Sequence, residues 1–232
     1  MKLIKPKFWD HKNLISLSLF PLSLIIQLVI FFKKKFTKMS SFKIPIVCIG
    51  NIYIGGTGKT PLVNNLAVHF KKRFKTFIIK KNYSSHEDEK RLLETKNKVI
   101  FKKTRMESLL IAEQEGAEVV IFDDGLQEKT LNYDLKIACF NSLKLDGNGQ
   151  VIPAGPLRER LDSVKNYDII LINGHIYKDT KNFIKKIKKI NPNLKIFMGK
   201  YVPKNYSQLK KKKFLAFSGI GNPHTFNETL KN

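Results

Sequence analysis

The sequence predicts an α/β fold in which a mostly parallel sheet carries helices on both faces and is preceded by a long apolar helix. Three observations predict this arrangement. Short segments rich in β-branched and aromatic residues alternate with segments of helical periodicity. A glycine-rich loop stands between the first of these strands and the first helix, and an uncharged apolar run lies near the N-terminus.

The first element is the apolar run from Leu14 to Phe32, nineteen residues without a charge. Its length reaches the roughly 18 to 20 residues that a membrane-spanning helix needs. Lysines flank it on both sides, so a helix lying in the membrane interface fits as well as a spanning one. A secretory signal is disfavoured because no small-residue cleavage site follows. A buried core helix is the remaining alternative, and we expect residues 1–40 to form a membrane-associating helix.

Six strands and three helices are expected after this segment, in one domain over residues 41–213. The expected strands are Ile44–Gly50, Thr76–Lys80, Glu118–Asp123, Leu135–Phe140, Asp168–Asn173 and Leu194–Gly199. The expected helices are Thr60–Lys72, Thr104–Glu115 and Asp179–Ile190.

The charge balance is strongly basic. The 232 residues include 43 Lys and Arg against 19 Asp and Glu, a net charge of +24. Such an excess suggests either an anionic membrane surface or nucleic acid as partner, although an AT-biased genome would also produce it. Because arginine clusters and interleaved aromatic residues are missing, we expect no nucleic-acid partner. The two cysteines sit singly in strand-like runs, which excludes a disulfide framework.

The glycine-rich loop has the composition of a phosphate-binding loop in a P-loop NTPase-type fold. Its glycines allow backbone N–H groups to face phosphate oxygens, Lys59 can reach the β and γ phosphates, and Thr60 can hold Mg²⁺. Tyr53 stands where the usual GxxxxGK[ST] pattern has glycine. We expect ATP to bind through Tyr53, Ile54, Gly55, Gly56, Thr57, Gly58, Lys59 and Thr60.

Acidic residues are available for the metal and for the acceptor. Asp123 and Asp124 end a predicted strand at the carboxyl edge of the sheet, where ligands of α/β folds bind. We expect both to hold Mg²⁺ with Thr60, as in a Walker-B motif. A second cluster at 87–89 is either a charged helix cap or the source of a base that deprotonates an acceptor hydroxyl.

Several motifs together resemble the tetraacyldisaccharide 4′-kinases of lipid A biosynthesis. The motifs are KPKFW (5–9), GNIYIGGTGKTP (50–61), DDGLQ (123–127) and GNGQVIPAGPLRE (147–159). The resemblance implies a kinase on the cytoplasmic face of the bacterial inner membrane. It would transfer the γ-phosphate of ATP, with Mg²⁺, to the 4′-hydroxyl of a tetraacyldisaccharide 1-phosphate. The catalytic residues it implies are Lys59, Asp124 and Asp88, with Asp88 as base, and the substrate-contacting residues are Lys81, Gln127 and Arg158.

The chain also departs from the family's motifs. Lys80–Ser84 replaces an SRGYG-like motif, and Glu128 stands where the family has histidine. Residues 214–232 resemble the opening of the family's second domain, so we expect that domain to be truncated. Two alternatives therefore stay open: a membrane-attached nucleotide switch of the partition type, disfavoured by Ile54 in place of a lysine, and a catalytically impaired remnant of the kinase.

Overall fold

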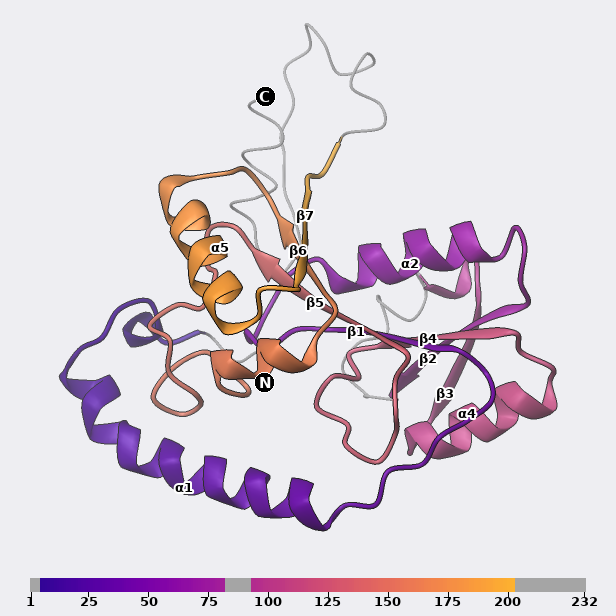
Figure 1. Ribbon diagram of the computed structural model, residues 1–232, viewed down its shortest axis with the longest axis horizontal. Helices are drawn as coiled ribbons and strands as arrows, with labels where there is room; N and C mark the ends of the chain where they lie inside the picture. The colour runs from indigo at the N-terminus through magenta and orange to yellow at the C-terminus, as the bar shows by residue number, and fades with distance from the viewer. Residues whose placement is uncertain (1–4, 82–92, 203–232) are drawn as a thin grey trace, which may run out of the picture.

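A single sheet of seven parallel strands forms the centre of the computed structural model, which describes residues 5–81 and 93–202 (Figure 1). The strand order is β3-β2-β4-β1-β5-β6-β7. The strands are β1 Ile46–Gly50, β2 Thr76–Lys81, β3 Lys98–Lys102, β4 Val119–Asp123, β5 Leu135–Asn141, β6 Ile169–Asn173 and β7 Lys195–Gly199. Because all strands run in one direction, their carboxyl ends meet at one edge of the sheet.

Helices cover both faces of this sheet, as the sequence predicts. They are α2 Lys59–Phe70 on one face, and α4 Arg105–Gln114 and α5 Lys178–Ile190 on the other. Alternate residues of β1 enter the two cores, since Cys48 packs with the α4 and α5 side and Ile49 with the α2 side. A parallel sheet buried in this way requires strands that are apolar on both faces. The five residues of β1 and of β4 are all buried.

The observed helices and strands after residue 41 begin and end within two residues of the predicted ones. The exceptions are the short 3-10 helix η2, Leu161–Asn166, and the strand β3, neither of which was predicted. Strand β3 lies at the edge of the sheet, has lysine at both ends, and buries only Ile100. An edge strand needs no continuous apolar run, so its sequence carries little of the usual strand pattern.

The N-terminal helix α1, Leu14–Phe36, lies apart from the sheet along one side of the molecule (Figure 1). Among the described residues it is the one helix long and apolar enough to cross a membrane, by length and composition. Most of its apolar side chains are exposed, including Leu17 at 60% and Val29 at 62%. The side chains that turn toward the protein lie in one stripe, namely Ser16, Leu19, Ser23, Ile26 and Gln27.

Ser23 is the fixed point of this stripe. Its hydroxyl donates to the carbonyl of Val151 over 2.8 Å and accepts from the amide of Ala154 over 3.1 Å. The α1 helix therefore meets the protein through a mixed stripe that includes its polar residues Ser16, Ser23 and Gln27, whereas its outward face is apolar, unlike a helix that covers a soluble core. The predicted start of a second domain, 214–232, lies outside the described residues.

Candidate active site

The glycine-rich loop that joins β1 to α2 has a backbone that only glycine fits at one position. Gly58, the residue before α2, has a φ of 83°, in the left-handed region that favours glycine. A Cβ on Gly58 would lie 2.5 Å from Asn173 Nδ2. The same Asn173 Nδ2 donates to the carbonyl of Thr57 over 2.6 Å, and Asn51 Nδ2 donates to the carbonyl of Gly55 over 3.2 Å. These two asparagines hold the loop in shape from both sides.

The GPLRE segment runs beside the start of this loop. The amide of Ile54 donates to the carbonyl of Pro156 over 2.9 Å, and the amide of Arg158 donates to the carbonyl of Ile52 over 2.6 Å. Tyr53 and Leu157 pair between them in an antiparallel bridge. This ladder explains why the two motifs occur together, because it brings Arg158 to the phosphate loop.

Lys59 and Thr60 meet the two aspartates at the carboxyl edge. Lys59 Nζ lies 3.1 Å from Asn51 Oδ1 and 3.6 Å from Asp124 Oδ1. Thr60 Oγ1 donates to Asp123 Oδ2 over 3.4 Å. The contacts follow from the topology, since β1 and β4 are neighbouring parallel strands. The structure thus brings these predicted site residues together.

Asp124 is held in a strained backbone by cations. Its φ of 64° is left-handed, which is uncommon for a residue other than glycine and occurs at functional sites. Arg158 Nη1 lies 2.8 Å and 3.0 Å from its two carboxylate oxygens, and Arg105 donates to its carbonyl. Burial by itself raises the pKa of Asp124, but the nearby Lys59 and Arg158 outweigh burial, so its pKa lies below the usual value. The carboxylate is therefore ionised at neutral pH.

Asp123 is paired with a lysine that was not among the predicted site residues. Lys80 Nζ lies 2.7 Å from Asp123 Oδ2, and the two side chains are 9% and 1% exposed. The register of the sheet sets Lys80 of β2 directly opposite Asp123 of β4. The other carboxylate oxygen, Oδ1, is buried without a hydrogen-bond partner in the part of the chain that the structure describes. An ionised oxygen buried in this way has capacity for one more cation or donor.

The family model described as tetraacyldisaccharide-1-P 4'-kinase matches residues 15–232. The chain belongs to this family. It is therefore a member of a family of ATP-dependent kinases, which are phosphotransferases. This result supports neither the partition-type switch nor the impaired remnant.

Related proteins and a solved structure agree with this assignment. The chain is 48% identical over 238 residues to the tetraacyldisaccharide 4'-kinase of Pelagibacter ubique, covering 100% of this chain and 74% of that protein. It is 33% identical over 253 residues to the tetraacyldisaccharide 4'-kinase of Rickettsia peacockii, covering 100% of this chain and 76% of that protein. The crystal structure of LpxK from Aquifex aeolicus in complex with ATP matches with a TM-score of 0.60 and 21% identity, over 89% of this chain and 87% of that chain. That similarity confirms the P-loop NTPase-type fold.

A hydrogen-bond network extends the kinase site behind Arg158. Arg158 Nη1 donates to Gln127 Oε1 over 3.2 Å, and Gln127 Nε2 donates to Glu159 Oε1 over 3.0 Å. The same Glu159 oxygen accepts from the Tyr167 hydroxyl over 2.6 Å. Gln127 and Arg158 therefore contact each other at the site, while Glu159 and Tyr167, which were not predicted, hold them from behind.

The remaining predicted residues have different surroundings. The side chain of Tyr53 is 1% exposed and packs in a small apolar cluster with Val151 and Leu157, so it does not line the loop. Lys81 ends β2 with an exposed side chain. Asp88, the predicted base, lies outside the described residues.

Sequence signals for the residues that were missed differ in strength. Glu159 closes the PAGPLRE motif, and Lys80 begins the segment that departs from SRGYG, so both could have been considered. Arg105, which reaches the carbonyl of Asp124 from α4, had no motif around it. Its role depends on the fold alone.

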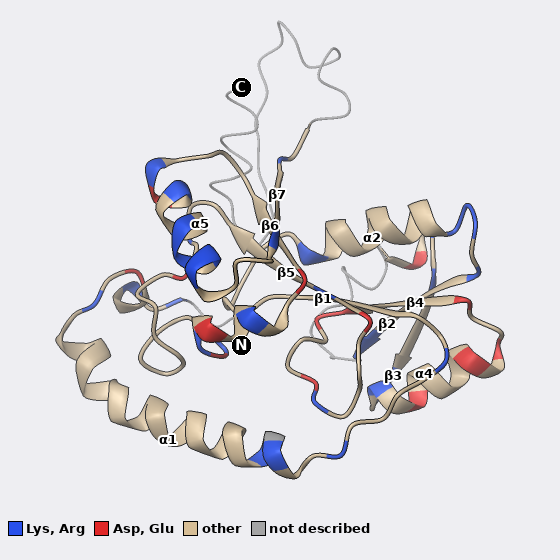
Figure 2. Ribbon diagram, viewed as in Figure 1, with Lys and Arg blue, Asp and Glu red and all other residues tan. Residues whose placement is uncertain are grey.

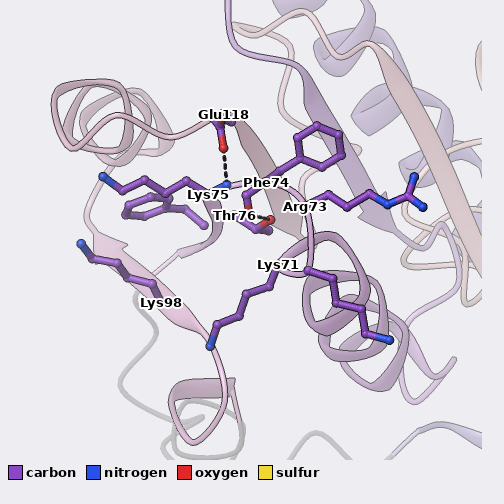
Figure 3. Close-up of a pocket in the computed structure, with 9 residues that line it drawn as sticks. Lys71, Arg73, Phe74, Lys75, Thr76, Lys98 and Glu118 are labelled. Carbon is purple, nitrogen blue, oxygen red and sulfur yellow. Dashed lines mark hydrogen bonds between the residues drawn. The ribbon is translucent and has the colours of Figure 1, made fainter.

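A separate cavity of about 460 Å³ lies at the opposite edge of the sheet, where β2 begins (Figure 3). Lysines and Arg73 line it, but the labelled basic side chains point in different directions in Figure 3. Lys98 is already paired with Glu115 and lies over the ring of Phe77. This cavity is not part of the kinase site.

Proposed function

We propose that this protein transfers the γ-phosphate of ATP to the 4′-hydroxyl of a tetraacyldisaccharide 1-phosphate, a step of lipid A biosynthesis. The observation that carries the proposal is the meeting of Lys59 and Thr60 with Asp123 and Asp124 at one edge of the sheet. Phosphoryl transfer depends on positioning and charge stabilisation more than on covalent chemistry. A phosphate loop, the cations Lys59 and Arg158, and two carboxylates at one edge are groups that this reaction can use.

The loop Gly55–Thr60 binds the ATP phosphates in this proposal. Its glycines and the N-terminus of α2 present backbone N–H groups to anions. When ATP binds, the Lys59 ammonium exchanges its contacts with Asp124 and Asn51 for the phosphates, because a triphosphate carries more negative charge than one carboxylate. Tyr53 and Ile54 contribute by shaping the entrance of the loop, since the Tyr53 side chain is buried and the Ile54 amide donates to the carbonyl of Pro156.

Mg²⁺ fits the same edge. The buried Oδ1 of Asp123 lacks a hydrogen-bond partner among the described residues, and Thr60 Oγ1 is adjacent to this carboxylate. Thr60, Asp123 and Asp124 would hold the ion, which supplies charge neutralisation for the phosphates. All three offer oxygen ligands, which Mg²⁺ prefers.

The acceptor is a glycolipid that carries a 1-phosphate. Arg158, with a side chain 29% exposed, together with Gln127 and Lys81, supplies its polar and anionic contacts in our proposal. A carboxylate must orient the 4′-hydroxyl and take its proton, and we assign that task to Asp88. Lys59 and Asp124 complete the catalytic set.

We propose the cytoplasmic face of the bacterial inner membrane as the place of the reaction, because ATP and a membrane-embedded acceptor meet there. The outward apolar surface of α1 supports this location, and lysines cluster at its C-terminal end (Figure 2). Residues 1–40 would act as the membrane-associating unit and 41–213 as the kinase domain.

The test is a direct transfer assay. The protein is incubated with MgATP and a detergent-dispersed tetraacyldisaccharide 1-phosphate, and mass spectrometry measures the gain of one phosphate. We expect product from the wild type and from Lys72→Ala, an exposed lysine just after α2, and a loss of about a hundredfold or more in Lys59→Ala. Lys59→Ala should keep its membrane association. A wild type that binds ATP yet makes no product would overturn the proposal.

A further inference from the structure

The Lys80–Asp123 pair is a buried ion pair at the position where the proposed kinase holds its divalent cation. The nitrogen and oxygen lie 2.7 Å apart, and neither side chain is more than 9% exposed. Taking two charges out of water is costly, and a pair of apolar side chains would fill the same place on neighbouring strands without that cost. The pair therefore calls for a use beyond packing.

The two oxygens of the Asp123 carboxylate have different surroundings. Lys80 and Thr60 both approach Oδ2, at 2.7 Å and 3.4 Å. Oδ1 is buried and has no hydrogen-bond partner within the described ranges 5–81 and 93–202. The lysine thus neutralises the carboxylate and fixes its rotation while one oxygen stays available.

The charges of the side chains at this edge affect the binding of both the metal and the phosphates. Arg158 and Lys59 pair with Asp124, and Lys80 pairs with Asp123, so these three cations exceed the two carboxylates by one positive charge before any phosphate enters. A further divalent cation must bind beside an ammonium group that repels it, in surroundings where charges are poorly screened. The triphosphate, in contrast, meets one more positive charge than a site without Lys80 would offer.

We propose that Lys80 is a positioning residue that acts as a resident cation at the metal position. It orients Asp123, weakens the binding of the divalent cation, and makes nucleotide binding depend less on that cation. The inference rests on the proposed function, because it takes the phosphate loop to bind ATP. It adds a residue and a regulatory property that the loop and the two aspartates do not supply.

The experiment measures metal and nucleotide binding separately from transfer. Electron paramagnetic resonance of Mn²⁺ gives the metal affinity in the presence of ATP, and a fluorescent ATP analogue gives nucleotide affinity with Mg²⁺ and with EDTA. Lys80→Ser should bind Mn²⁺ about tenfold more tightly than the wild type. Its nucleotide affinity should fall about tenfold more than that of the wild type when EDTA replaces Mg²⁺.

Two further variants serve as controls. Lys102→Ser, at an exposed lysine that ends the neighbouring strand β3, should keep the metal affinity of the wild type. Lys80→Arg keeps the charge and should keep the weak metal binding. If Lys80→Ser unfolds too readily for titration, its melting temperature is followed with and without Mn²⁺, and Mn²⁺ should raise it by more than in the wild type.

The outcomes distinguish the two proposals. Equal Mn²⁺ affinity and equal metal dependence in wild type and Lys80→Ser would overturn the role of Lys80 and leave the kinase proposal intact. If the Mn²⁺ and nucleotide affinities of the wild type and Lys80→Ser differ as expected, but the wild type transfers no phosphate to the glycolipid, the proposed function is overturned and the role of Lys80 stands. A wild type that binds no nucleotide would overturn both.

Discussion

The Tyr167 hydroxyl fixes Glu159, which in turn holds Gln127 and, through it, Arg158. The tyrosine is 5% exposed, and burial raises its pKa, so it is a protonated donor throughout the neutral range. Its oxygen lies 2.6 Å from a carboxylate oxygen, the distance of a charge-assisted hydrogen bond. The network therefore depends on a residue that lies outside the motif carrying Arg158 and Glu159.

We predict that Tyr167→Phe lowers the free energy of unfolding by about 1 to 3 kcal/mol, because it leaves Glu159 without its buried donor. Urea unfolding followed by circular dichroism measures this. Glu159→Gln and the double variant complete a double-mutant cycle, in which the two losses should be less than additive. Additive losses would mean that Tyr167 acts through packing and not through this hydrogen bond.

Single residues also mark the limit of prediction from sequence. Lys59, Thr60 and the two aspartates were predictable because their chemistry is encoded locally, in a loop between strand and helix and in a pair at a strand end. Lys80 begins a segment that departs from the family's motif, but its pairing with Asp123 was not predictable because it arises from the register that sets β2 beside β4. Tyr53 illustrates the opposite case, since a residue within the loop sequence turns its side chain away into an apolar cluster.

Among the elements, the phosphate loop is the one whose shape the sequence specifies most tightly. Two of its glycines have left-handed backbones, Gly58 with φ of 83° and Gly55 with φ of 112°. A Cβ at Gly58 would collide with Asn173 Nδ2 at 2.5 Å, whereas a Cβ at Gly55 would meet nothing within 4 Å. Alanine at either position would be strained by the left-handed backbone, but only alanine at Gly58 would also clash with a neighbouring side chain.

We therefore predict that Gly58→Ala weakens nucleotide binding by more than Gly55→Ala does. Strain of about 1 to 2 kcal/mol applies to each variant, and the displaced Asn173 adds to the loss at Gly58. Titration with a fluorescent ATP analogue should show a drop of about tenfold or more for Gly58→Ala. Equal affinities for the two alanine variants would show that Asn173 does not brace the loop.

The attachment of α1 is a second property of an element, and it depends on Ser23. Its hydroxyl both donates to Val151 and accepts from Ala154, so its removal leaves two buried backbone groups unpaired. We predict that Ser23→Ala lowers stability by about 1 to 3 kcal/mol. Thermal unfolding in detergent measures the change.

Ser18→Ala is the matched control, since Ser18 is exposed and bonds only within its own helix, to the carbonyl of Ile15. Alanine favours a helix equally in both variants, so the difference between them isolates the contact with the 151–154 segment. A loss in Ser18→Ala as large as in Ser23→Ala would show that the contact does not hold α1 in place.

The elements divide by how strongly their sequences encode them. Central strands such as β1 and β4 are continuous apolar runs, because both of their faces are buried, and they were predicted within two residues. The edge strand β3 buries Ile100 alone, and pairing with β2 holds it in the sheet. Prediction failed there because the information lies in the neighbouring strand and not in the segment itself.

At the scale of the whole molecule, the exposed apolar surface lies on α1, which is attached to the segment that leads into Arg158 at the kinase site. The exposed apolar residues of α1 form an outward surface. Basic residues, blue in Figure 2, lie at the C-terminal end of α1 and on α5. A monomeric soluble protein rarely exposes a continuous apolar surface of this extent. The basic groups suit an anionic membrane surface, while the apolar side chains supply the larger part of the binding free energy.

We predict that Ile25→Asp combined with Val29→Asp releases the protein from membranes. These side chains are 57% and 62% exposed, and one helical turn separates them on α1. Each contributes about 1.5 to 3 kcal/mol when buried in lipid, so the partition coefficient onto vesicles should fall about a hundredfold or more. Flotation with vesicles that contain anionic lipid measures the bound fraction.

The matched control changes two exposed apolar residues elsewhere, Phe197→Asp and Val202→Asp, which are 54% and 69% exposed. If α1 makes the membrane contact, this control stays bound while the α1 variant does not. Transfer to a detergent-dispersed acceptor should survive in the α1 variant, because the phosphate loop and both aspartates are untouched, whereas transfer to an acceptor in vesicles should fall with binding. Equal release of both double variants would show that net charge, and not the apolar surface of α1, controls membrane association.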